Sequence, residues 1–156
     1  TRRALWLSFA APLLMLPIML WLAGLYAGGT SEPDALFFIR QALGYIVAVF
    51  GFPVAMYYIA RFIERGSRYY LMVAAVNWTA PVQTALLAIG YLFYFWSPLP
   101  GLDDLPLLLV STYIMLYLWF TIRASLDISR GLAICLVCLM AIIQMTGMLL
   151  TQIRLF

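Results

Sequence analysis

The sequence contains no histidine and only two cysteines among its 156 residues. Without histidine the chain cannot hold a haem between two histidine ligands, form a serine–histidine protease pair or carry the histidine motif of zinc proteases. Two cysteines cannot complete a structural zinc site either, because such a site needs about four ligands. These enzyme classes are therefore excluded by composition, and we expect no metal and no cofactor.

Charged residues are scarce as well. They make up 10% of the chain, against roughly 25% in a soluble domain, and 66% of the residues are hydrophobic. The mean hydropathy is +1.02. No soluble fold buries so much apolar surface, so the composition predicts an integral membrane protein. A chain this short forms one membrane domain, which we take to be residues 1–156, and a larger activity would require partners or further copies.

Long apolar windows account for most of the chain. A bilayer core about 30 Å thick is crossed by about 20 helical residues, and the sequence predicts an all-α polytopic bundle of five transmembrane helices. The expected spans are residues 4–27, 37–63, 69–96, 105–122 and 131–150. The breaker-rich segments GGTSEPD (28–34) and SPLPGLDD (97–104) predict loops. Pro12 and Pro17 interrupt the first span, which is unlike a signal peptide, so we expect it to be retained.

Arginine positions predict the orientation, because basic loops near span ends resist translocation. One side of the expected spans carries Arg2, Arg3, Arg61, Arg65, Arg68, Arg123 and Arg130. The other side carries only Arg40 and Arg154. We therefore expect a multi-pass protein of the bacterial inner (cytoplasmic) membrane, with the N-terminus in the cytoplasm and the C-terminus in the periplasm.

The third span holds the densest group of neutral polar residues, which includes Asn77, Trp78, Gln83 and Thr84. Pro81 lies in the same run and cannot donate to the carbonyl of Asn77. The freed carbonyl and the side-chain amides need partners on another helix or a water. Two interpretations stay open, namely a polar network that holds helices together and a ligand contact or transport pathway.

Arginines near the span ends are candidate lipid or partner contacts. Arg61, Arg65 and Arg68 form a basic rim that should attract anionic lipid at about 1 kcal/mol each. Arg40, near the opposite end of the second span, can reach the headgroups or meet an acid such as Asp34. An anionic-lipid or partner contact is the alternative for Arg40.

Two pairs of residues inside the spans, one of glycines and one of cysteines, have spacings that place each pair on one helix face. Gly44 and Gly51 are seven residues apart, which puts them on one helix face and predicts a close helix contact. Cys135 and Cys138 form a CxxC pattern, but the sequence lacks the remaining ligands of a metal site. We expect both thiols to be buried as small apolar groups.

The acidic residues give little support to an enzyme or an ion-coupled transporter. All six lie in loops or at span ends, and the mid-bilayer zones hold no ionisable residue of the kind that coupled transporters use. Asp103 and Asp104 alone are weak support for two-metal chemistry on lipid headgroups.

Two stretches, GFPVAMYYIARFIERGSRYYLMVAAVNWTAPVQ (51–83) and YLWFTIRASLDISRGLAICLVCL (117–139), resemble bacterial members of the Yip family. The resemblance implies five membrane spans joined by short loops and, for the bacterial members, an integral inner-membrane protein without a defined reaction. Eukaryotic Yip proteins have a long cytoplasmic N-terminal region and act with Rab-type GTPases in vesicle trafficking. Only a few residues precede the first span here, so we do not expect GTPase recruitment.

The sequence thus favours a non-enzymatic protein that acts by binding, as a scaffold or an accessory subunit of a larger membrane assembly. The expected partners are membrane lipids and other membrane subunits or further copies of the chain, and no nucleic acid. The alternative is a small transporter or lipid-handling protein that uses the region from Asn77 to Gln83.

Overall fold

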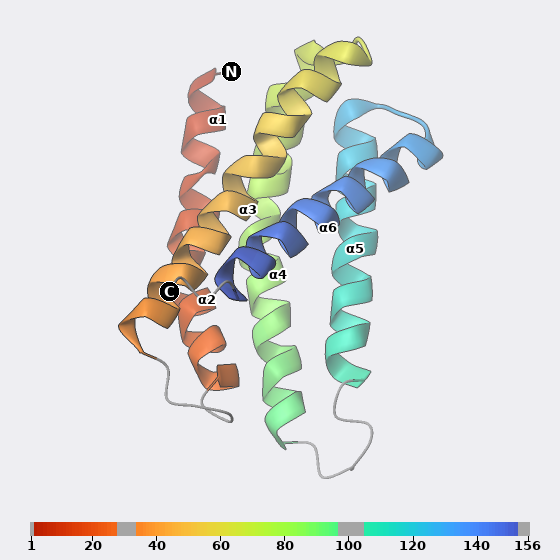
Figure 1. Ribbon diagram of the computed structural model, residues 1–156. Coiled ribbons are helices and arrows are strands. Elements are labelled where there is room, and N and C mark those ends of the chain that lie inside the picture. The colour runs from red at the N-terminus through yellow and green to blue at the C-terminus, as the bar shows by residue number, and fades with distance from the viewer. Residues whose placement is uncertain (1, 28–33, 97–104, 153–156) are drawn as a thin grey trace.

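The computed structural model describes residues 2–27, 34–96 and 105–152, and all regular elements in these ranges are helical (Figure 1). In chain order they are α1 (Arg2–Ser8), α2 (Ala10–Ala27), α3 (Ala35–Phe62), the 3₁₀ turn η1 (Gly66–Arg68), α4 (Tyr69–Trp96), α5 (Leu105–Leu126) and α6 (Arg130–Gln152). Five helical segments of the described chain are long and apolar enough to cross a membrane. The predicted all-α class and the number of candidate spans are confirmed.

The first span breaks at Phe9, between α1 and α2. Pro12, in the first turn of α2, lacks the N–H that would bond to the carbonyl of Ser8, so this helical hydrogen bond is missing beside the break. The helix α2 then continues through Pro17. Together α1 and α2 form one apolar segment, Arg3–Leu25, that is long enough to span a membrane.

The boundaries of α3 follow standard capping chemistry. Asp34 is its N-cap, and the Asp34 carboxylate accepts a hydrogen bond of 2.7 Å from the backbone N–H of Phe37. At the other end Glu64 has a φ of 59°, and the N–H of Arg65 reaches back to the carbonyl of Ala60 at 2.7 Å. This left-handed closure ends the helix and turns the chain into η1.

The helix α4 is the central element of the bundle. The pair α1 and α2 packs on one side of it and α5 packs on the other, while α3 and α6 pack along each other and run obliquely past these helices (Figure 1). The start of α1, the end of α3, η1 and the α5–α6 turn all lie at the same end of the bundle. We call it the arginine end, because all seven arginines predicted on one side lie in or beside these elements.

The hydrophobic core occupies the half of the bundle nearer the arginine end. It is built from α1, the end of α3, the start of α4, the end of α5 and the start of α6. Its largest fully buried hydrophobic side chains are Phe52, Met56, Met72, Leu118, Ile122 and Leu126. This half therefore has the close packing that fixes the relative positions of the helices.

The stretches farther from the arginine end form what we call the distal half, which comprises residues 18–27, 35–48, 83–96, 105–113 and 142–152. The buried residues among those whose side chains the structure describes there are Leu22, Gly44, Thr84, Gly90 and Gly147. Only one of them has a large hydrophobic side chain. Within the described residues, the distal half thus has helix contacts but hardly any hydrophobic core.

Glycines bring α3 and α6 close together. A Cβ added to Gly147 would lie 2.8 Å from the carbonyl oxygen of Gly44, and one added to Gly51 would lie 3.0 Å from a methyl group of Ile143. The prediction that Gly44 and Gly51 share a close helix contact is confirmed. Both helices use the absence of a side chain to approach each other, as small residues allow in membrane bundles.

Candidate functional site

Among the polar residues predicted on α4, Asn77 forms a hydrogen bond to another helix. Asn77 and its partner, Ser8, each lie close to a proline. The side-chain N–H of Asn77 donates to the hydroxyl oxygen of Ser8 at 2.9 Å, and the Ser8 hydroxyl donates to the carbonyl of Leu5 at 2.7 Å. Both Asn77 and Ser8 are buried. Each lies four residues before a proline, Pro81 and Pro12, so each backbone carbonyl has lost its usual helical N–H donor. The hydrogen bond therefore ties α4 to the break between α1 and α2.

The other predicted members of this group lie differently. Gln83 donates to the hydroxyl of Thr79 at 2.5 Å, a bond within α4, and Thr79 donates to the carbonyl of Val76 at 2.6 Å. Thr84 is buried, whereas Trp78 is 60% exposed and points outward from the bundle. The structure thus brings Asn77 together with Ser8 and leaves Gln83 bonded to its own helix.

Ser8 was not predicted from the sequence. The signal was nevertheless present, because Pro12 follows Ser8 at the same distance at which Pro81 follows Asn77. What the sequence does not contain is the packing of α1 against α4, which places two residues 69 positions apart within hydrogen-bond distance.

The predicted basic rim is spread over the arginine end. Arg61 lies over the ring of Tyr57, with its guanidinium carbon 5.6 Å from the ring centroid, and donates to the Tyr57 hydroxyl at 3.1 Å. Arg68 forms an ion pair with Asp127 across the bundle, with 3.4 Å between nitrogen and oxygen. Arg65 is half-buried beside η1, and the structure gives it no ion pair among the described residues.

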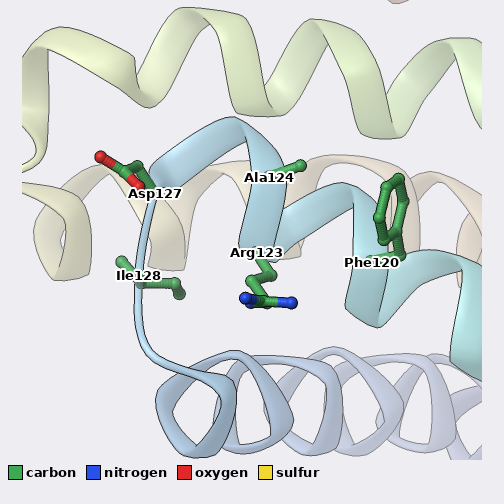
Figure 2. Close-up of a pocket in the computed structure, with 5 residues that line it drawn as sticks. All are labelled: Phe120, Arg123, Ala124, Asp127 and Ile128. Atoms are coloured by element: carbon green, nitrogen blue, oxygen red, sulfur yellow. The ribbon is translucent and has the colours of Figure 1, made fainter.

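Arg123, one of the arginines that predict the orientation, lies in the last turn of α5. Arg123 lies over the indole of Trp119 at 5.7 Å from the ring centroid, and the indole N–H donates to the carbonyl of Arg130 at 3.2 Å. Beside this arginine the surface is hollowed, with a cavity of about 260 Å³ (Figure 2). The hollow is lined by Phe120, Arg123, Ala124, Asp127 and Ile128, and we call it the Arg123 hollow.

Arg40 lies within the second turn of α3 and is half-buried. Its Nε atom is buried and has no hydrogen-bond partner among the described residues, and Asp34 is not within ion-pair distance of it. Asp34 instead caps α3. Whether Arg40 contacts lipid or a partner stays a prediction.

The two cysteines lie on the outer surface of α6, so the expectation that they are buried is wrong. Cys135 and Cys138 are both free and exposed. They share one face, as their spacing predicts, but the rotation of α6 turns that face outward. Among the described residues no group of three or more His, Cys, Asp or Glu side chains is close enough to hold a metal ion. Asp103 and Asp104 lie outside the described residues.

Comparison of the chain with protein-family models, curated proteins and solved structures finds no match.

Proposed function

We propose that this chain acts by binding inside a membrane, as a scaffold or an accessory subunit of a larger assembly, and catalyses no reaction itself. The observation that carries the proposal is the uneven packing of the bundle. The core half is closely packed, whereas the buried residues described in the distal half are almost all small. Apolar helix faces that the chain itself leaves uncovered remain for lipid or for a partner helix in a membrane.

The large outward-facing surface agrees with this proposal. In the most apolar window of each candidate span, only between 17% and 33% of the residues are buried inside the chain. Lipid covers such surface in a lone protein, and the helices of a partner cover part of it in an assembly. The partners in this proposal are membrane lipids and other membrane subunits or further copies of the chain, without nucleic acid or a cofactor.

The proposed setting is the bacterial inner membrane, with the arginine end in the cytoplasm. The seven arginines support it, because they fall at one end of the bundle and basic segments are retained on the cytoplasmic side. Ser67, which is exposed in η1, provides a test. A Ser67→Cys variant lacking Cys135 and Cys138 should react with a membrane-impermeant thiol reagent in inverted vesicles only. Reaction in right-side-out vesicles only would reverse the orientation.

The resemblance to bacterial Yip proteins supports the same proposal, since it implies an inner-membrane protein without a defined reaction. The alternative of a transporter or lipid-handling protein built on α4 has less support, because the amides of Asn77 and Gln83 already donate to Ser8 and Thr79. A folded variant with Asn77→Leu and Gln83→Leu tests it. Full cellular function in this variant would remove α4 as a transport pathway.

Cross-linking from α4 tests the proposed binding surface. Phe93 in the distal half and Leu71 in the core half are each 61% exposed, so they form a matched pair on one helix. A photoreactive amino acid at position 93 should cross-link in native membranes to one defined protein, in a fixed and saturable ratio. The same residue at position 71 should cross-link mainly to lipid. Equal lipid-only products from both positions would contradict the proposed surface.

A further inference from the structure

The Arg123 hollow is formed by the last turns of α5 and by the turn that leads into α6. Figure 2 shows the guanidinium of Arg123 on the α6 side of α5, while the carboxylate of Asp127 points away on the opposite side. The cavity measures about 260 Å³. A cavity needs only about 10 to 15 Å³ by the same measure to hold one water, so the hollow has room for a phosphate group.

The guanidinium of Arg123 lies beside an aromatic ring. Its carbon lies 5.7 Å from the centroid of the Trp119 ring, and the Trp119 indole N–H donates to the Arg130 carbonyl at the start of α6. An arginine stacked on an aromatic ring keeps its edge N–H groups free for a ligand. The planar fork of these donors matches two oxygens of a phosphate.

The positive charge of Arg123 is not neutralised by the neighbouring acid. Asp127 is the acidic residue that lines the hollow, and its carboxylate is paired with Arg68 at 3.4 Å. Among the described residues no carboxylate lies within ion-pair distance of Arg123. The hollow therefore offers one uncompensated positive charge, and Arg130 follows at the start of α6.

The apolar side of the hollow faces outward. Phe120 and Ala124 line the hollow and are exposed, and Ile134 is exposed on the adjoining helix α6. All three lie near the arginine end, where the candidate spans begin or end. In a bilayer, lipid phosphate groups lie beyond the hydrocarbon core, where spans begin and end, and the acyl chains run beside the spans.

We propose that the Arg123 hollow is a binding site for an anionic phospholipid, with the phosphate held by the Arg123 guanidinium and an acyl chain lying against Phe120. The site differs from the rim of Arg61, Arg65 and Arg68, because it combines a hollow, a guanidinium over an indole ring and an apolar wall. It does not depend on the scaffold role, so either proposal can fail without the other.

Arg61 supplies a matched control. It also lies over an aromatic ring at the arginine end, but it donates to the hydroxyl of that ring and does not line the hollow. Wild type, Arg123→Gln and Arg61→Gln are compared in nanodiscs of phosphatidylcholine with increasing phosphatidylglycerol, and retained lipid is measured by native mass spectrometry. Circular dichroism and elution volume check that each variant is folded.

The expected result is a loss of phosphatidylglycerol affinity of between about 10- and 100-fold in Arg123→Gln, the range for losing charge-assisted hydrogen bonds. Arg61→Gln should lose no more than about fivefold, the effect of one surface charge. Arg123→Lys should fall between wild type and Arg123→Gln, because it keeps the charge and loses the fork. Equal affinity in wild type and Arg123→Gln would overturn the proposal.

Two further measurements make the assignment specific. Inorganic phosphate at millimolar concentration should not displace the lipid, and displacement would show a site for soluble phosphate instead. A phosphatidylglycerol analogue with a photoreactive headgroup, added to the wild-type protein, should label residues 119–130. This second measurement needs no variant, so it decides the matter if Arg123→Gln fails to fold, and labelling confined to other segments would overturn the proposal.

Discussion

The crossing of α3 and α6 depends on a glycine that has no room for a side chain. The Cβ of an alanine at position 147 would lie 2.8 Å from the Gly44 carbonyl oxygen, 3.6 Å from its carbonyl carbon and 3.7 Å from the Cβ of Ala48. The nearest of these atoms is backbone, so no side chain can turn away to relieve the contact. Gly147→Ala therefore forces the two helices apart.

The magnitude follows from two opposing terms. Overpacking at a well-packed contact typically costs about 1 to 3 kcal/mol, and replacing glycine by alanine in a helix gains up to about 1 kcal/mol. Gly131, at the start of the same helix, is a matched control because a Cβ added there meets nothing within 4 Å. Gly131→Ala should thus be neutral or stabilising. The difference in unfolding free energy between the two variants should be about 1 to 3 kcal/mol, because both variants share the gain from replacing glycine by alanine in a helix.

The assay is reversible unfolding in mixed micelles with increasing sodium dodecyl sulfate, followed by far-ultraviolet circular dichroism. Spin labels on the outer faces of α3 and α6 report whether the helices separate in Gly147→Ala. If the two alanine variants change the free energy of unfolding equally, within about 0.5 kcal/mol, the close approach of Gly147 to Gly44 does not exist in the folded protein.

Three further outcomes are expected in the same unfolding assay. A double-mutant cycle with Ser8→Ala and Asn77→Ala should give a coupling free energy of about 0.6 kcal/mol, and no more than about 1.7 kcal/mol, as for other interhelical hydrogen bonds in membranes. Additive effects of the two substitutions would show that the side chains do not interact. Tyr45→Phe removes a 2.7 Å hydrogen bond to the backbone of α2 and should lower the unfolding free energy by about 1 kcal/mol. An unchanged unfolding free energy would show that this hydrogen bond is absent. Alanine at both Cys135 and Cys138 should change it by less than about 0.5 kcal/mol, because both side chains face outward, and a large loss would show that they are packed.

The spans were predictable because they depend only on length and composition. An apolar window of about 20 residues has few alternatives to a membrane helix. Proline shows where such prediction stops. Pro12 coincides with a break, whereas α3 and α4 continue through Pro53 and Pro81 as single helices. All three prolines lack the same backbone N–H, so the presence of proline alone does not predict where a helix breaks.

Helix rotation could not be predicted from the sequence. Asn77 and Trp78 are adjacent, yet the first is buried against α1 and the second faces outward. Cys135 and Cys138 share a face, but whether that face is covered depends on where α5 and α3 pack against α6. In a chain that is apolar on all sides, hydrophobic pattern alone does not distinguish the buried face from the lipid-facing one.

The Arg123 hollow could not be predicted from the sequence either. Trp119 and Arg123 are four residues apart, which places them on one face of a helix, and this stacking is a local pattern. The pairing of Asp127 with Arg68 joins two distant segments, and it is this pairing that leaves Arg123 without a counter-charge. Only the packed bundle reveals that combination.

The most direct test of the proposed binding role is the mass of the intact particle that contains the native chain, ejected from its own membrane and measured by native mass spectrometry. We expect the chain in a fixed ratio with another membrane subunit or with further copies of itself, with lipid retained in addition. A lone chain that carries only lipid or a small molecule would contradict the scaffold or subunit role.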